Sequence, residues 1–396
     1  MSERILVGTR KGTFFVEKIG GTWRPRLAGH AGVGVNFVSR DPHTDTLWAA
    51  LGHGHWGAKL SRSTDGGQTW RDAPQIKYPE GARHLLPPMP SEDGEPTGAV
   101  VLKSATLQKL WVMAFAPGRI YVGTIPGGLF VSDNGGETFE LNRPLWNHDS
   151  RGGDLFSSVG SVGAAAEDLS TRKTHWFGTP AAEGGEFAPG LHSIAVNPKD
   201  PNHLLVAVST AGVLESTDGG KSWQGRNRGM TNDYLPNPEA EWGHDPHAIE
   251  LCAADPRHVW QQNHAGVFYS SDGAKTWRKV SKPEKGVRFG FPVAVDQKDG
   301  RCAWLVPGHS DMQRMTIDGA LFVARTQDGG ETWEDLREGL PQQGAYDVVL
   351  RHALGNSGDA LAFGSTTGNL YVSEDRGESW KGVTHNLPPI YSVRFA

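Results

Sequence analysis

The sequence predicts an all-β fold, a seven-bladed β-propeller of four-stranded antiparallel blades, with six blades as the alternative. Three observations predict it. An eight-residue pattern, Ser-x-Asp-x-Gly-x-Thr/Ser-Trp, returns along the chain, short strand-like runs precede it, and the chain holds 52 Gly and 14 Trp. Glycine-rich turns between short apolar runs, repeated along the chain, are typical of propellers.

The repeated octet has the residues of a tight turn followed by an anchor. Its Asp can accept hydrogen bonds from the backbone N–H groups ahead of it, and its Gly can adopt a positive φ. The closing Trp starts the next strand with a large apolar ring. We therefore expect a structural hairpin turn in each copy. The six copies are Ser63–Trp70, Ser132–Phe139, Ser216–Trp223, Ser270–Trp277, Thr326–Trp333 and Ser373–Trp380.

The segment before the third copy shows the strands of one blade. It reads as strand a (His192–Val196), strand b (Leu204–Ser209) and strand c (Gly212–Glu215), and the octet turns strand c into strand d. In the second half of the chain the copies approach the ~40–50-residue period of propeller repeats. Two longer gaps predict loop insertions at about residues 71–109 and 140–190 within one domain, residues 1–396.

The two ends of the chain complete the count. Met1–Pro25 reads as strands b, c and d of a blade whose octet has decayed. Its missing strand a is expected at Ile390–Ala396. A blade shared by both ends would close the ring and leave no free sheet edge.

The six octets resemble the Asp-box (BNR) repeats of sialidase-like propellers. Similar boxes occur in xyloglucanases, sortilin-type receptors and the photosystem II assembly factor, so the resemblance implies a fold and not one activity. A true sialidase is not indicated. The Arg-Ile-Pro segment of that family has its nearest match at Arg119–Gly123, where Tyr121 replaces the proline, and no arginine triad can be identified.

Composition excludes several classes of function. The net charge is −5 and no basic block is present, which argues against nucleic acid. No run of 18 apolar residues and no signal peptide can be recognised, so we expect a cytoplasmic protein without a membrane partner. Cys252 and Cys302 lie in apolar runs and are expected to be buried free thiols. The oligomeric state stays open.

Strand order places the octets on one rim of the ring and the long insertions on the other. A ligand site is expected on the rim with the long loops. On that rim, His192 and His247 stand at the start of strand a in two neighbouring blades. Trp111 and Phe291 stand at the matching positions of two other blades. Val33, Tyr346 and Tyr391 are the approximate equivalents in other blades. The loops between strands b and c add His53, His55, Trp56, His264, His309, Asp311, Arg314, Arg10 and Lys11 to this rim.

These residues lead to one main hypothesis, an intracellular small-molecule hydrolase or lyase. Imidazoles that converge at a channel mouth can bind Zn, Fe or Cu, or act as acid and base. The candidate metal ligands are His53, His55, His192, His247, His264 and His309. The candidate binders of a small or sugar-like ligand are Trp56, Trp111, Phe291, Arg10 and Arg314.

Two alternatives remain. A glycoside hydrolase would use loop carboxylates, Glu241 and Asp245. With the acid and base groups of the main hypothesis, the candidate catalytic residues are His192, His247, Asp245 and Glu241. Glu250 is not a candidate, because strand alternation would turn it away from the channel if His247 points in. The other alternative is a non-catalytic binding or assembly propeller.

Overall fold

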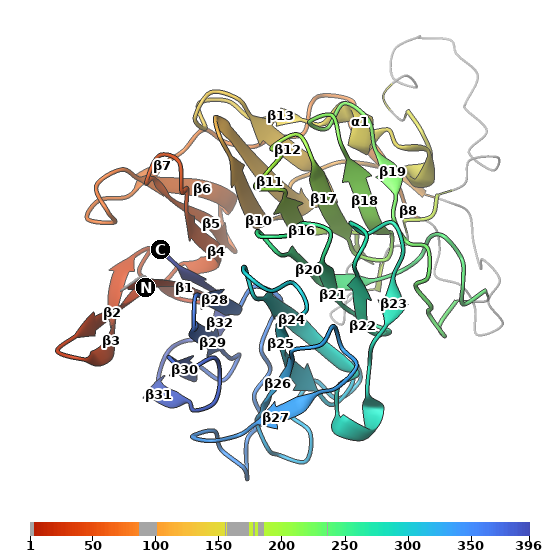
Figure 1. The fold of residues 1–396 in the computed structure, drawn as a ribbon. Helices are drawn as coiled ribbons and strands as arrows, with labels where there is room; N and C mark the ends of the chain where they lie inside the picture. The colour runs from red at the N-terminus through yellow and green to blue at the C-terminus, as the bar shows by residue number, and fades with distance from the viewer. Residues whose placement is uncertain are drawn as a thin grey trace, which may run out of the picture.

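The protein is a ring of seven four-stranded antiparallel sheets. The computed structural model describes residues 4–86, 101–154, 156, 174–176, 179–180, 186–235 and 237–396. Figure 1 shows the sheets around a central axis, with the two ends of the chain side by side. The seven-bladed prediction is confirmed, and the six-bladed alternative is wrong.

Each blade runs from an inner strand to an outer one. The first four blades in ring order are β32-β1-β2-β3 (Ile390–Phe395, Arg4–Thr9, Gly12–Ile19, Thr22–Gly29), β4-β5-β6-β7 (Gly34–Arg40, Leu47–His53, Gly57–Ser63, Arg71–Asp72), β10-β11-β12-β13 (Lys109–Ala116, Arg119–Ile125, Leu129–Ser132, Glu140–Leu141) and β16-β17-β18-β19 (Leu191–Val196, Leu204–Val208, Gly212–Ser216, Gln224–Gly225).

The remaining three blades repeat the same order. They are β20-β21-β22-β23 (Pro246–Leu251, Val259–Asn263, Gly266–Ser270, Arg278–Lys279), β24-β25-β26-β27 (Phe289–Val295, Ala303–Gly308, Val323–Thr326, Glu334–Leu336) and β28-β29-β30-β31 (Leu354–Ser357, Ala360–Gly364, Leu370–Ser373, Lys381–Thr384).

The two predicted insertions hold the short remaining elements and lie partly outside the described residues. The first contains the hairpin β8 (Arg83–Leu86) and β9 (Val101–Ser104). The second contains α1 (Arg143–Trp146), a 3-10 turn at Asp149–Arg151 and the pair β14 (Thr179–Pro180) and β15 (Glu186–Phe187). A further 3-10 turn lies at Pro283–Lys285. No helix in the described part of the chain is long and apolar enough to span a membrane.

The shared blade closes the ring as the sequence predicts. β32 pairs antiparallel with β1, with Val7 opposite Val393 and Ile5 opposite Phe395. Val7, Ile5 and Val393 are fully buried, so this junction is part of the hydrophobic core. Hydrogen bonds and buried apolar side chains therefore hold the two ends of the chain together.

The octets form the predicted turns. In the third copy, Asp218 Oδ1 accepts hydrogen bonds from the backbone N–H groups of Lys221 and Ser222, each at 2.9 Å, and the Ser216 hydroxyl accepts one from Gly220 N at 2.8 Å. Asn134 keeps the same role in the second copy, because its Oδ1 accepts from Thr138 N at 3.0 Å. The hydrogen bonds are internal to the turn, which supports a structural role.

The tryptophan that closes an octet also links two blades. Trp277 Nε1 donates to Arg226 O at 2.7 Å, and Trp333 Nε1 donates to Val280 O at 3.1 Å, in each case in the preceding blade. Both side chains are more than nine-tenths buried. Cys252 and Cys302 are buried free thiols, as expected.

Candidate functional site

Six of the seven inner strands, all within the described residues, carry a β-bulge near the predicted mouth of the channel. In a β-bulge, two residues of one strand face a single residue of the partner strand, so that the direction of a side chain changes. In β24, Phe291 and Pro292 together oppose Val306, and Pro292 has no N–H to offer a ladder. In the other five strands the unpaired residue is Asn36, Trp111, His192, His247 or Tyr391.

The bulges explain one wrong prediction. Since the alternation of side chains shifts at His247, Glu250 does not turn away from the channel. It lines a channel cavity of about 450 Å³ together with residues of β4, β10, β16, β28 and β32. Burial raises the pKa of this carboxyl to about 7, against the lowering effect of the Arg394 charge.

The centre of the candidate site is a cluster formed by Asp245, His247 and His264. Among the described residues, this is the one group of His, Cys, Asp and Glu side chains arranged to hold a metal ion, with ligand atoms within 4.8 Å of one another. Asp245 Oδ2 lies 3.7 Å from His247 Nε2 and 3.7 Å from His264 Nδ1. The neighbouring blade orients Asp245 as well, since Thr210 N donates to its Oδ1 at 3.3 Å.

A backbone hydrogen bond fixes the orientation of His247. Its Nδ1–H donates to Gly290 O at 2.6 Å, so Nε2 is left to face Asp245. The ring also stacks on Phe291, with the centroids 4.7 Å apart. Burial lowers the pKa of His247 although Asp245 opposes the shift, so the neutral imidazole is favoured. A neutral imidazole with one nitrogen so anchored can act as a base or as a metal ligand.

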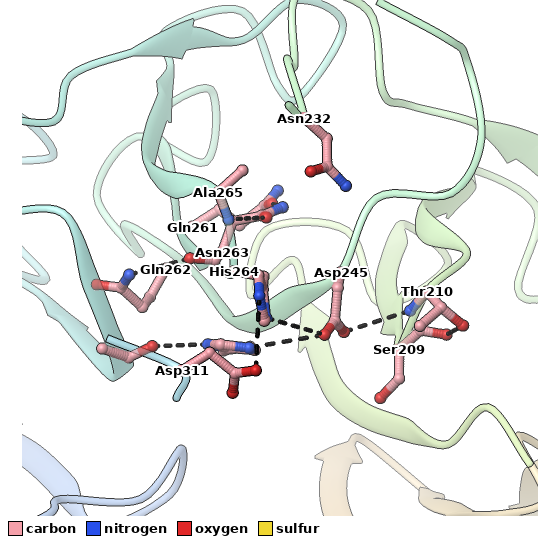
Figure 2. Close-up of polar contacts among 12 residues, drawn as sticks. Ser209, Thr210, Asn232, Asp245, Gln261, Gln262, Asn263, His264, Ala265 and Asp311 are labelled. Atoms are coloured by element: carbon pink, nitrogen blue, oxygen red, sulfur yellow. Dashed lines mark hydrogen bonds and ion pairs between the residues drawn. The ribbon is translucent and has the colours of Figure 1, made fainter. Parts of the chain in front are cut away.

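A second carboxylate lies on the other side of His264. His264 Nε2 is 3.9 Å from Asp311 Oδ2, and Figure 2 shows His264 linked both to Asp245 and to Asp311. Burial opposes ionisation of Asp245, but the interaction with His247 and the charge of Arg351 outweigh it and hold its pKa well below the usual range. Asp245 is therefore held in its ionised form.

Aromatic and basic side chains border the cluster. The Arg351 guanidinium lies between Trp111 and Phe291, with Cζ 5.2 Å and 5.1 Å from the two ring centroids. His192 is fully buried and makes an edge contact with Trp111 at 5.2 Å between centroids. Tyr234 is 72% exposed and packs edge-on against His264. Tyr234 is therefore the most exposed of these aromatic rings.

The structure brings together some of the predicted residues and not others. Seven of the predicted residues lie at or beside the cluster, namely His192, His247, His264, Asp245, Trp111, Phe291 and Arg314. His53, His55 and Trp56 form a separate group on the β5–β6 loop, where His53 stacks on Trp56 at 4.7 Å. His309 contacts its own loop, through Met315 and Ser310. Arg10 is exposed and its N–H donates to Pro389 O.

Glu241 does not join Asp245. Its neighbours are Gly225, Arg226 and Asn227, at the outermost strand of the blade, and burial raises its pKa. The chain runs inward between positions 241 and 245, so the two carboxylates lie at different radii. The second carboxylate near His264 is Asp311. The sequence placed Asp311 on the rim with the long loops but gave it no catalytic role.

Sequence reasoning missed Arg351, Lys109 and Tyr234. The approximate equivalents Val33 and Tyr346 were wrong, because the bulged residue of β4 is Asn36 and the mouth position before β28 holds Arg351. The one signal for Arg351 was a basic residue three positions before the inner strand β28.

The fold and the cluster define this protein as a seven-bladed β-propeller with a polar site at one channel mouth. No model of a known protein family matches the chain. Its curated relatives include an oligoxyloglucan-reducing end-specific xyloglucanase of Emericella nidulans, 26% identical over 227 residues, or 49% of this chain. They also include a probable enzyme of the same name from Neosartorya fischeri, 29% identical over 164 residues, or 39% of this chain.

The matches cover only part of each relative. The chain spans 26% and 18% of the lengths of those two proteins. Among solved structures, an ancestral GH74 enzyme has a TM-score of 0.53 at 16% identity, over 88% of this chain and 38% of that one. A 6-phosphogluconolactonase-type protein of Bacteroides uniformis has a TM-score of 0.54 at 11% identity, over 99% of both chains. The structural likenesses support the propeller fold.

Proposed function

We propose that this chain is a glycoside hydrolase that binds an oligosaccharide at the channel mouth. The observation that carries the proposal is the pair of carboxylates, Asp245 and Asp311, on two sides of His264. Glycoside hydrolysis commonly uses two carboxyl groups that flank the scissile bond, one ionised and one that supplies a proton. The xyloglucanase names of two relatives support a sugar substrate.

The two carboxyl groups have different surroundings and so different roles. Asp245, held ionised, acts as the base or the nucleophile. Asp311 supplies the proton to the leaving oxygen. Its ion-pair partner Arg314 has a side chain that is 60% exposed on a loop, so an entering sugar can displace it. The exposed Tyr234 offers an apolar face on which a sugar ring can pack.

The test is turnover of xyloglucan oligosaccharides and of a panel of aryl glycosides. We expect Asp245→Asn and Asp311→Asn to lose about 10²–10⁴-fold in kcat with native melting temperatures. Asp255→Asn, on a turn of the opposite rim, is the matched control and should keep full activity. An inactive wild type across the whole panel would refute the proposal and would leave the non-catalytic propeller.

A second candidate function is a metal-dependent hydrolase or lyase. It is favoured by the three ligand atoms of Asp245, His247 and His264 and by the Gly290 carbonyl that orients His247. Two histidines and one carboxylate with open positions suit Zn or Fe, and imidazoles also suit Cu. Metal analysis of the purified protein separates the two candidates, because a chelator should abolish this activity and leave a carboxylate-only glycosidase unchanged.

A further inference from the structure

Arg351 lacks the partners that a guanidinium in a channel wall normally has. Its side chain lies between the Trp111 and Phe291 rings, and its buried Nε has no hydrogen-bond partner. Its other nitrogens likewise make no hydrogen bond or ion pair with any described residue. Arginine carries five N–H donors, and buried polar groups are nearly always hydrogen-bonded. The buried Nε therefore lacks a partner, and the terminal nitrogens are free to bind a ligand.

Two further groups around the same indole ring are also unpartnered. Lys109 Nζ lies 4.9 Å from the Trp111 centroid and makes no hydrogen bond within the described structure. His192 is fully buried, and neither of its ring nitrogens has a hydrogen-bond partner. Arg351, Lys109 and His192 come from three different blades, so the fold assembles these donors at one place.

The nearby acids do not neutralise the two cations. Asp245 and Asp311 both act on Arg351 electrostatically, but neither forms an ion pair with it. Asp245 faces His247 and His264, and Asp311 is paired with Arg314. Burial, with the Arg351 charge, lowers the pKa of Lys109 to about 8, and burial lowers that of Arg351 to about 10. Two like charges lie beside one indole ring, and no carboxylate of the described residues forms an ion pair with either.

We propose that Arg351 and Lys109, with His192 as an additional donor, bind an anionic group of the ligand, a carboxylate or a phosphate ester. The planar fork matches either group, and the two aromatic faces hold it in place. The inference deepens the proposed function and rests on it for the nature of the ligand. The substrate class becomes an acidic sugar, whose charged group binds at Arg351 and whose reacting bond lies at Asp245.

The test compares anionic and neutral probes that share one sugar ring. D-glucuronate, D-glucose 6-phosphate and D-glucose are titrated calorimetrically into the wild type, Arg351→Met, Lys109→Met and the control Arg257→Met, which changes an exposed arginine on the opposite rim. We expect an anionic probe to bind more tightly than glucose, and Arg351→Met to weaken it at least about tenfold. Arg257→Met should bind as the wild type does.

The two anionic probes separate the two sources of charge. Binding of glucuronate alone identifies a sugar acid, and binding of the phosphate alone identifies a phosphorylated sugar. Equal binding of all three probes, no binding of either anion, or unchanged binding by Arg351→Met overturns the inference.

Thermal unfolding without ligand gives a second readout. Since methionine removes an unpaired cation and keeps the contacts with the rings, Arg351→Met should melt at or above the wild-type temperature. A purely structural brace between Trp111 and Phe291 requires the opposite, a lower melting temperature. Unchanged hydrolysis of anionic glycosides, such as aryl glucuronides, by Arg351→Met would overturn this subsite and leave the proposed function. Anion binding without any turnover would overturn the proposed function and leave the subsite.

Discussion

The buried carboxyl of Glu250 should make the stability of this protein depend on pH. Its pKa rises from 4.5 to about 7 in the folded chain, chiefly because the channel desolvates it. A raised pKa means that the folded state favours the neutral acid, so stability is full below about pH 4.5 and falls as the pH rises through 7. At 1.36 kcal/mol per pH unit the total loss is about 3 kcal/mol.

The variant Glu250→Gln removes this dependence. Glutamine keeps a carbonyl oxygen for the Val295 N–H, which Glu250 accepts at 3.2 Å, and it cannot ionise. We expect the free energy of unfolding of the variant, relative to the wild type, to increase by about 2.5 kcal/mol between pH 5 and pH 8. Urea unfolding followed by tryptophan fluorescence at the two pH values measures it. The exposed Glu284 gives the matched control, Glu284→Gln.

A constant difference between Glu250→Gln and the wild type from pH 5 to pH 8 would refute the reasoning. It would mean that water reaches the carboxyl in the channel as freely as it does in the unfolded chain. The control Glu284→Gln should show no such change. If its unfolding free energy relative to the wild type increased equally between pH 5 and pH 8, the effect would come from net charge and not from burial.

Two further predictions concern the turns and the thiols. Gly229→Ala should cost about 3 kcal/mol or more in unfolding free energy, because φ is +88° and a Cβ would lie 2.3 Å from Trp277 O. Gly273→Ala, at φ +77° with open space around it, should cost only about 1 kcal/mol, and equal costs in chemical denaturation would contradict the clash. Cys252 and Cys302 should not react with a thiol reagent in the native protein, whereas both should react after denaturation, and fast native labelling would show that the blades open.

Much of the fold could be predicted because its rules are local. The octet's Asp, Gly and Trp each have a role within a few residues, so Ser216–Trp223 and its five relatives identified the blades. The closing strand followed from the same count, since Met1–Pro25 lacked one strand that Ile390–Ala396 could supply. The strand pairing between Val7 and Val393 confirms that inference.

The site was less predictable because bulges change the direction of side chains. Regular alternation of side chains along the strand from His247 predicted that Glu250 points away from the channel. The extra residue of the bulge in β20 reverses this, and Glu250 lines the channel cavity. Trp111 and Phe291 were placed correctly because each is the bulged residue, or one of the bulged pair, of its own strand. Arg351 was missed because the turn after β28 has Asp359 without the proline that follows Asp200 and Asp255 in other blades.

The closure between β1 and β32 has a consequence for how the protein is made. The first blade to leave the ribosome is the last to be completed, because its inner strand is synthesised after all the other blades. Until then β1 has an unpaired edge, and its apolar residues Ile5, Leu6 and Val7, which are buried in the folded protein, are exposed. An exposed apolar edge is a template for pairing with another chain. A chain truncated before β32 should therefore aggregate.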